Sequence, residues 1–431
     1  MKTIVALATP AGNSGVAIIR ISGEKSKEIL NKLTDSNCDF EPRKMYLKTI
    51  KFGNLTDKCL VVFFANPFSF TGEDVAEIHS HGGYYIAQQI INTCVDLGCK
   101  LAEAGEFSKR AFINGKMSID QAEGIMDLIN AESEMQARSG SELMQGKLKE
   151  KINYYQNSLT EILAEIEAKL DYPEYEYTDS ESTNIKQKLQ NLIEEFSSLI
   201  SESKSGLMIK NGIKIAIVGA PNVGKSSILN ALTKSNKAIV TNIAGTTRDV
   251  VEAQYEFNGV IFRLFDTAGI HESDDIVEKI GINKALQTLE DADLVLRVSS
   301  PDNICDISTE KPYINVFNKT DLLKSKKDEN YFYISATNNE NITELKQEIF
   351  NKTIHDDLKS NKLYLTNTRH IDAIKQAKLL LENVIEIFDF TTMDIISSEI
   401  KSAWNSLGEI SGVTSDETII DKIFSKFCLG K

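Results

Sequence analysis

Hydrophobic positions in the first quarter of the chain alternate with polar ones, which is typical of β-strands. Three segments show this pattern or a strand-like composition, at residues 3–9, 15–23 and 51–64. Two later segments carry apolar residues at helical spacing, at 84–97 and 105–116. The pattern predicts a mixed α+β domain over residues 1–117.

From residue 118 to about 210 the apolar positions recur every three or four residues, which predicts an antiparallel set of helices. The acidic segment 171–183 is expected to be an exposed turn. Helical spacing returns at about residue 355 and continues towards residue 431. We therefore predict one helical domain, 118–210 and 355–431, with an α/β domain, 211–354, inserted in it. An independent C-terminal bundle is the alternative, although fewer than about 80 residues would need partners to bury a core.

A glycine-rich turn follows the apolar run Ile215–Val218 and precedes a helical pattern. Its spacing is Gly219, four residues, and then Gly224-Lys225-Ser226, which fits a phosphate-binding loop. Backbone N–H groups and the start of the following helix would face an anion. We expect Lys225 to reach the β- and γ-phosphates of a nucleotide, and the Ser226 hydroxyl to bind Mg²⁺.

Further motifs favour GTP over ATP. The carboxylate of Asp321 can accept hydrogen bonds from N1–H and the 2-amino group of guanine, which adenine cannot supply. Asp266 follows a predicted strand and is expected to hold metal-bound water, while the Gly269 N–H would sense the γ-phosphate. The motifs occur in order as Gly245-Thr246-Thr247-Arg248-Asp249, Asp266-Thr267-Ala268-Gly269, Asn318-Lys319-Thr320-Asp321 and Ser335-Ala336.

The expected hydrolytic machinery is unusual because Ile270 directly follows the Asp266-Thr267-Ala268-Gly269 motif. Small Ras-like GTPases place a glutamine there to orient the attacking water, and isoleucine cannot polarise water. Candidates for the missing help are Arg248, a nearby carboxylate or a bound cation. Asn222 suits a cation, because its carboxamide oxygen would lie beside the phosphates and could bind K⁺.

Composition narrows the class of protein. With 431 residues, 42% hydrophobic and 26% charged, the chain fits a globular protein of two to four domains. The apolar run near residue 1 is too short for a signal peptide, and no run is long enough to cross a bilayer, so we expect a cytoplasmic protein. Six cysteines without a C-x-x-C pair signal neither zinc nor disulfides, and a metal site at His79 and His81 is disfavoured. The net charge of −14 argues against non-specific coating of nucleic acid.

The sequence resembles the MnmE (TrmE) family of tRNA-modification GTPases over essentially its whole length. Besides the GTPase motifs, the likeness rests on ATPAGNSGVAIIRISG, FTGEDVAEIHSHGG, AGEFSKRAFINGKMSIDQAEGIMDLI and the closing FCLGK. Departures are modest. GAPNVGKSS stands for the usual GRPNAGKSS, PAGNSG for a more basic turn, and CLGK for CIGK.

The resemblance implies an N-terminal domain that binds a tetrahydrofolate derivative, 5-formyl or methylene, and forms a homodimer. It also implies a discontinuous helical domain, an inserted Ras-like P-loop GTPase domain, and modification of the wobble uridine C5 of tRNA with the FAD-dependent partner MnmG in a heterotetramer. The implied folate positions are Arg20, Glu77, Lys116 and Lys431, and basic groups suit folate carboxylates. Without the resemblance, Arg20 would read as a solvated charge at a strand end and Glu77 as an acid at a helix start.

In the GTPase domain, the resemblance assigns K⁺ to Asn222, Thr241, Ile243 and Thr246, and Mg²⁺ to Ser226 and Thr247. It assigns Glu278 to positioning the attacking water, although Glu278 also fits a solvated helix face. Cys428 is either a reactive thiol or a buried apolar residue of the last helix. The full set expected to contact nucleotide is Asn222, Val223, Gly224, Lys225, Ser226, Ser227, Thr241, Asn242, Ile243, Ala244, Gly245, Thr246, Thr247, Asp266, Thr267, Ala268, Gly269, Asn318, Lys319, Asp321, Ser335 and Ala336.

Two other classes of protein compete with this interpretation. A ribosome-assembly GTPase would need a recognisable RNA module with a basic face, and the regions flanking the α/β domain are acidic or helical. A protein that binds GTP without hydrolysing it is favoured slightly by Ile270. Asn222, the GTTRD motif and Glu278 argue against it.

Overall fold

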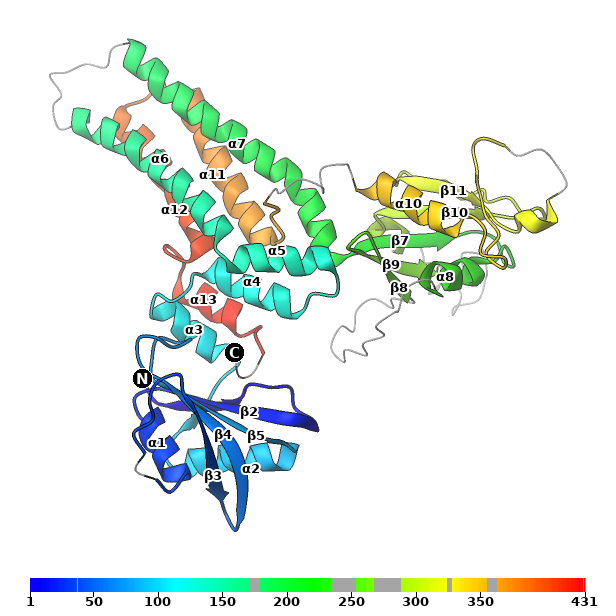
Figure 1. Cartoon of the computed structure of the whole chain (residues 1–431). Helices are drawn as coiled ribbons and strands as arrows, with labels where there is room; N and C mark the ends of the chain where they lie inside the picture. The colour runs from blue at the N-terminus through cyan, green and yellow to red at the C-terminus, as the bar shows by residue number, and fades with distance from the viewer. Residues whose placement is uncertain are drawn as a thin grey trace, which may run out of the picture. The chain divides into compact units, whose positions relative to one another are not determined.

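A computed structural model describes residues 1–36, 38–170, 179–234, 253–266, 288–323, 328–354, 363–428 and 430. These residues form two compact units. Unit 1 comprises Met1–Met126, Leu143–Leu189 and Leu379–Lys431, and unit 2 comprises Asp127–Glu142 and Gln190–Lys378. Figure 1 shows the elements of both. The predicted domain boundaries at residues 117, 210 and 354 stay a prediction.

Unit 1 begins with a six-stranded sheet in the order β3-β4-β5-β2-β1-β6. Its strands are antiparallel neighbours except β6, which pairs in parallel with β1. The strands are β1 Ile4–Leu7, β2 Ser14–Ser22, β3 Met45–Phe52, β4 Leu55–Phe64, β5 Val75–Gly82 and β6 Lys100–Leu101. Helices α1 Ser26–Leu33 and α2 Tyr84–Asp96 pack on the sheet and share its apolar core.

The period of two in β2 sorts its side chains between the two faces of this sheet. Ala17, Ile19 and Ile21 lie in the core shared with α1 and α2. The intervening Arg20 therefore points to the opposite face. In the antiparallel register it stands across from Glu77 of β5, which faces the same way.

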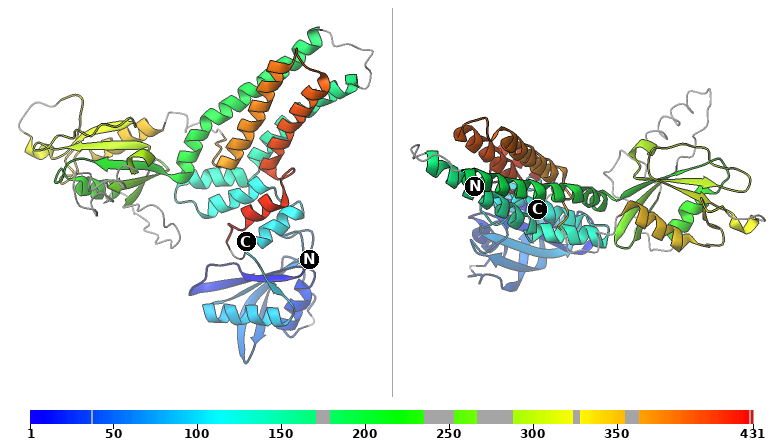
Figure 2. Two further views of the ribbon diagram at one scale, coloured as in Figure 1. Left: turned by 180° about the vertical axis from the view of Figure 1, so that it is seen from behind. Right: turned by 90° about the horizontal axis from the view of Figure 1, so that it is seen from above.

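Unit 1 also contains a bundle whose helices come from both sides of the nucleotide motifs. Helices α6 and α12 lie side by side in Figure 2, and the Gln156 amide donates to the Trp404 carbonyl over 3.1 Å. Lys186 in α7 forms an ion pair of 2.7 Å with Asp389, which follows α11. The two helical segments thus form one bundle, and the alternative of an independent C-terminal bundle is wrong. The helices outside the two sheet regions are α3 Glu106–Ile113, α4 Ile119–Ile129, α5 Glu134–Met144, α6 Lys147–Leu170, α7 Asp179–Asn211, α11 Thr368–Ile387, α12 Met393–Ser411 and α13 Glu417–Phe424.

The last helix, α13, returns the chain to α3. Phe424 and Phe427 pack in an apolar cluster with Phe112. Lys109 of α3 forms an ion pair with Asp421 of α13. These contacts hold the C-terminal end of the chain beside the N-terminal sheet within unit 1.

Unit 2 is built on a second six-stranded sheet, in the order β12-β11-β10-β7-β9-β8. Only β8 is antiparallel to its neighbour among these strands. Alternate residues of the central β7 enter two apolar clusters, Ile215 and Ile217 one, Ala216 and Val218 the other. Burial on both faces explains the continuous apolar run that the sequence shows there. The elements are β7 Ile213–Val218, α8 Lys225–Lys234, β8 Ala253–Phe257, β9 Val260–Asp266, β10 Leu294–Ser299, β11 Tyr313–Phe317, the 3₁₀ turn Thr320–Leu322, β12 Phe332–Tyr333 and α10 Ile342–Thr353.

The structure confirms most predicted elements and corrects three. The strand expected over residues 51–64 is a hairpin, because Gly53 adopts a positive φ of 56° and turns the chain between β3 and β4. Glu77 lies in strand β5, not at a helix start. Residues 179–183 of the acidic segment belong to α7 rather than to a turn, and 171–178 lie outside the described residues. Within the described part of the chain, no helix combines the length and the apolar character that a membrane span requires.

Gly105 is a testable constraint at the α3–α13 contact. Its φ is +71°, and a Cβ atom would lie 2.2 Å from the carbonyl oxygen of Phe424. We expect Gly105→Ala to lower the free energy of unfolding of unit 1 by about 1–3 kcal/mol through backbone strain, and by a further amount through the steric clash. Denaturant unfolding followed by circular dichroism measures it. Gly115→Ala is the matched control, because Gly115 has a φ of +67° and no atom within 4 Å of the added Cβ. Equal losses in both variants would contradict the proposed clash.

Candidate functional site

The glycine-rich turn connects β7 to α8 in unit 2, as the sequence predicts. The Lys225 ammonium group donates to the carbonyl oxygens of Gly219 and Ala220, at 2.8 and 3.2 Å, so the lysine spans the loop. Asn222 has a φ of +64°, which asparagine tolerates better than most residues. The loop therefore has the turned backbone that an anion cradle requires.

Position 224 favours glycine because Asn318, which follows β11, lies close to its backbone. Its φ is +95°, and a Cβ atom there would lie 2.3 Å from the amide nitrogen of Asn318. The loop and the Asn318 motif are thus packed at a distance that only glycine permits. Two motifs 94 residues apart meet at this point.

Asn318 ties three of the predicted motifs together. Its side chain is buried, donates to the Val223 carbonyl over 2.9 Å and accepts from the Ala336 N–H over 3.1 Å. The Ser335 hydroxyl donates to the Asp321 carboxylate over 2.7 Å. Because these hydrogen bonds fix the exposed Asp321 carboxylate beside the phosphate loop, the geometry suits a guanine base next to its phosphates.

The described residues also fit a magnesium ion. The Ser226 hydroxyl lies 3.5 Å from a carboxylate oxygen of Asp266, at the end of β9. A hydroxyl and a carboxylate at the phosphate loop are hard oxygen donors, which Mg²⁺ prefers. For K⁺, the described candidate ligand is the Asn222 side chain.

Many predicted site residues lie outside the described residues. They include the remaining K⁺ and Mg²⁺ ligands and both proposed hydrolytic side chains of the α/β domain. These residues are Thr241, Asn242, Ile243, Ala244, Gly245, Thr246, Thr247, Arg248, Thr267, Ala268, Gly269, Ile270, Glu278 and, at the chain end, Lys431.

A second polar centre lies in unit 1. The Arg20 guanidinium forms an ion pair of 2.8 Å with Glu77 and lies over the rings of Phe70 and Phe107, at 5.6 and 5.8 Å from their centroids. Burial raises the pKa of Glu77, but the hydrogen bond to His79, at 3.3 Å, and the charge of Arg20 outweigh it and leave that pKa below its ordinary value. Arg20 is therefore a paired, half-buried group, and the solvated strand-end interpretation is wrong.

The C-terminal segment reaches this centre. Arg20 donates to the carbonyl oxygen of Gly430 over 3.3 Å. Gly430 has a φ of +88°, and a Cβ atom there would lie 2.2 Å from the Leu7 carbonyl, so the chain passes closely over β1. A side chain at the glycine of the closing FCLGK motif would therefore clash with the backbone of β1.

Two further predicted residues have defined places near this segment. Lys116 is exposed, and its side-chain stem lies against Gly72, where a Cβ atom would come within 3.2 Å of it. Cys428 is exposed and follows α13, which ends at Phe424, so the prediction of a buried apolar residue in the last helix is wrong.

Sequence reasoning missed four contributors to the Arg20 centre: His79, Phe70, Phe107 and the Gly430 carbonyl. The alternation in β5 was the available signal for His79, because residues 77 and 79 of a strand share a face. His81 shares it too, and its ring lies 2.6 Å from Asp57. The aromatic residues and the carbonyl come from distant segments, and no local pattern indicates them.

Asn318 provides a test of the nucleotide site. Asn318→Ala removes the partners of the buried Val223 carbonyl and Ala336 N–H, and each unsatisfied group costs about 1–3 kcal/mol. We expect affinity for GDP to fall about tenfold or more, measured by titration with a fluorescent GDP analogue. Asn315→Ala is the matched control in strand β11, which ends just before Asn318, because the Asn315 amide donates to the exposed Asn330 carbonyl at 3.3 Å. Unchanged affinity in Asn318→Ala would refute the role of Asn318.

Comparison with known proteins places the chain in a family. Residues 3–116 match the family described as GTP-binding protein TrmE N-terminus, and residues 119–428 match the MnmE helical domain. Among solved structures, the FeoB G-domain from Methanococcus jannaschii aligns at 28% identity and a TM-score of 0.26, covering 33% of this chain and 97% of that one. The G domain of the T. maritima FeoB iron transporter aligns at 28% identity and 0.25, covering 33% and 99%.

Full-length relatives decide the assignment. The protein named tRNA modification GTPase MnmE of Clostridioides difficile (strain 630) is 36% identical over 454 residues, covering 100% of this chain and 99% of the relative. The protein of the same name from Francisella tularensis subsp. holarctica (strain FTNF002-00 / FTA) is 37% identical over 448 residues, with the same coverage. The helical, TrmE-type N-terminal and P-loop parts of the fold agree with these matches, and the chain belongs to the MnmE family of tRNA modification GTPases.

Proposed function

We propose that this chain is a K⁺-stimulated GTPase that modifies the wobble uridine C5 of certain tRNAs. It works as a homodimer in the cytoplasm, together with an FAD-dependent MnmG-like partner, and uses a tetrahydrofolate one-carbon donor. The observation that carries the GTPase part is the buried Asn318 amide, which joins the phosphate loop to the Asp321 and Ser335-Ala336 motifs. Relatives named tRNA modification GTPase MnmE, alignable along the whole chain, support the choice of tRNA as substrate.

Hydrolysis must proceed without a glutamine after Gly269, because the chain has Ile270 there. A cation between the β- and γ-phosphates would stabilise the charge that develops as the bond breaks. Asn222 supports this, because its turned backbone is part of the phosphate loop and its side chain carries a carboxamide oxygen. Mg²⁺, when bound, neutralises the phosphate oxygens, and Ser226 and Asp266 are the described residues that would hold it.

The Arg20 centre supports the folate part. An arginine can bind the carboxylate tail or a polar ring edge of a folate, and a carboxylate such as Glu77 accepts hydrogen bonds from the pterin N–H edge. Phe70 and Phe107 beside Arg20 give the centre flat apolar surfaces. Lys116 and Lys431 complete the proposed set.

GTP turnover in different salts tests the K⁺ proposal. We expect turnover at saturating GTP to be at least about tenfold faster in KCl than in NaCl of the same concentration, because Na⁺ is too small for a site built for K⁺. Asn222→Ala should remove most of this difference while GDP still binds. Phosphate release measures the rates. Equal, negligible rates in both salts would exclude the K⁺ mechanism.

Calorimetric titration with 5-formyltetrahydrofolate tests the folate site. The unaltered protein should bind, and Arg20→Ala, or removal of Lys431, should weaken binding at least about tenfold through loss of a charge-assisted hydrogen bond. Arg43→Ala is the control in the same domain, because Arg43 is exposed, and its guanidinium donates to the Phe68 carbonyl at 3.3 Å and lies over the Phe68 ring. If Arg20→Ala binds as tightly as the control, the folate site lies elsewhere.

A further inference from the structure

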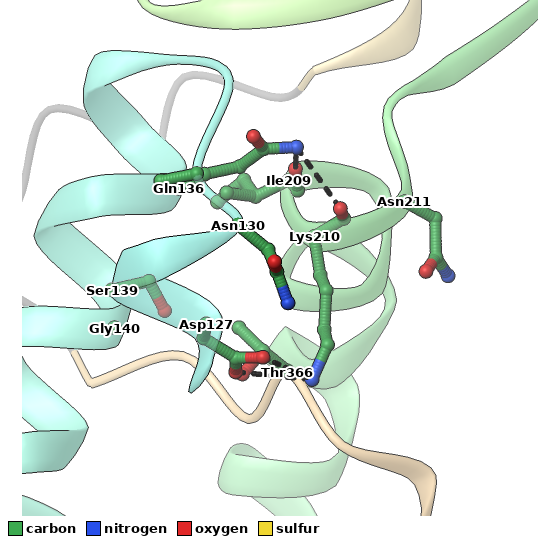
Figure 3. A pocket seen from close by; sticks show the side chains of 10 residues that line it. Asp127, Asn130, Gln136, Ser139, Gly140, Ile209, Lys210, Asn211 and Thr366 are labelled. Carbon is green, nitrogen blue, oxygen red and sulfur yellow. Dashed lines mark hydrogen bonds and ion pairs between the residues drawn. The ribbon is translucent and has the colours of Figure 1, made fainter. Parts of the chain in front are cut away.

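The connection between α4 and α5, residues 130–133, lies against the C-terminal end of α7 in unit 2. Figure 3 shows Gln136, in the first turn of α5, pointing towards the last turn of α7. Its amide nitrogen donates to the carbonyl oxygens of Ile209 and Lys210, at 3.2 and 3.0 Å. A helix leaves its last four carbonyls without helical partners, so Gln136 satisfies two of these groups from another element.

A second contact ties the same two elements together. The Lys210 ammonium group forms an ion pair with Asp127 near the end of α4, at 2.8 Å. The two residues are half-buried, so water screens the pair less than it would screen an exposed one. The end of α7 is therefore held to the α4–α5 connection by side chains from both flanking helices.

On its opposite side, the α4–α5 region contacts the six-stranded sheet of unit 2. The Met135 N–H donates to the Gly259 carbonyl, in the turn between β8 and β9, over 3.1 Å. Glu132 forms an ion pair with Arg263 in the middle of β9, at 3.2 Å. Arg263 also packs on the residue that separates α7 from β7, because a Cβ atom at Gly212 would lie 3.0 Å from its Nε.

Glu132 and Gln136 are themselves joined. The Glu132 backbone N–H donates to the Gln136 side-chain oxygen over 2.7 Å. One amide side chain thus accepts from the residue that binds β9 and donates to the end of α7. A displacement of β9 that moves Glu132 would therefore act on the hydrogen bonds that hold α7.

Strand β9 leads directly to the candidate metal site. Arg263 lies three residues before Asp266, whose carboxylate faces the Ser226 hydroxyl of the phosphate loop. A shift of β9 at Asp266 on nucleotide or metal binding would therefore move Arg263 as well, because the two residues are joined by the backbone of one strand. Helix α7, for its part, continues from unit 2 into unit 1 at residues 189 and 190.

The contacts surround a cavity of about 190 Å³. Seven of its ten lining residues are polar or charged, and the full lining comprises Asp127, Asn130, Ala131, Gln136, Ser139, Gly140, Ile209, Lys210, Asn211 and Thr366. Pockets for small molecules are usually about 300–1,000 Å³, so this one is too small for a nucleotide or a folate. A close-packed interior resists rotamer changes, whereas free volume beside Gln136 and Lys210 permits them.

We propose that Glu132 and Gln136 are positioning residues that couple strand β9, and through it the nucleotide site, to the C-terminal end of α7. The proposal rests on the proposed function, in that the chain binds and hydrolyses GTP. Neither residue belongs to the phosphate loop or to the other nucleotide motifs. Their task is to make the hydrogen bonding of the last turn of α7 depend on the state of the nucleotide.

Hydrogen exchange in the full-length protein tests the coupling. A non-hydrolysable GTP analogue should change the exchange rate of the amides in residues 205–212 about fivefold or more. In Glu132→Gln and Gln136→Leu, which keep the approximate side-chain size, the analogue should still bind with similar affinity while this change is lost. Glu165→Gln is the matched control, since it removes an ion pair to Lys188 within unit 1 and should keep the change.

A charge swap adds a readout that a merely structural role would not give. Glu132→Arg and Arg263→Glu should each abolish the exchange response, and the double variant should restore it. Variants that bind the analogue and respond like the unaltered protein would overturn the coupling, as would variants that lose analogue binding altogether. If the unaltered protein binds no GTP analogue, the proposed function fails instead, and the two failures are therefore distinct.

Discussion

The packing of α6 on α12 is the constraint on which the arrangement of the chain depends. The Gln156 amide and the Trp404 carbonyl that join these helices are 248 residues apart in sequence. Closing so long a loop costs conformational entropy, which the buried apolar faces of both helices offset. These faces include Ile152, Tyr155, Leu159 and Ile162 on α6, and Ile396, Ile400, Ala403 and Leu407 on α12.

An inserted domain fits this constraint only if its two ends are close together. The structure meets the requirement in unit 2, where a Cβ atom at Gly206 of α7 would lie 2.3 Å from the Leu365 carbonyl of the returning chain. The departing and returning segments thus touch without an intervening side chain. The sheet around β7 has its own apolar core, to which Ile209 of α7 belongs and against which Met135 of α5 packs.

How much the sequence could predict depended on how local each feature is. The phosphate loop and strands such as β7 and β11 follow from short patterns, because glycine spacing and continuous apolar runs report the local backbone. The β3–β4 hairpin was harder, since one residue of positive φ, Gly53, divides a run that reads as a single strand.

The candidate sites show the same division. Asn318 and Asp321 could be assigned from a four-residue motif, whereas the hydrogen bond from Asn318 to Val223 needed the sheet to bring β7 and β11 near each other. The burial of Arg20 could not be foreseen, because Phe70, Phe107 and Gly430 reach it from three separate segments. Gln136 belongs to no motif, and only the fold gives it partners.

The contact between Arg20 and Gly430 has a consequence for the order of events during synthesis. The two residues are 410 positions apart. At ribosomal speeds of about 5–20 residues per second, the Arg20 strand waits roughly 20–80 s before its last partner is made. The N-terminal sheet can fold in that interval around its own core, but a polypeptide released early carries an Arg20 centre without the glycine carbonyl. Completion of this centre therefore requires that synthesis has passed Gly430.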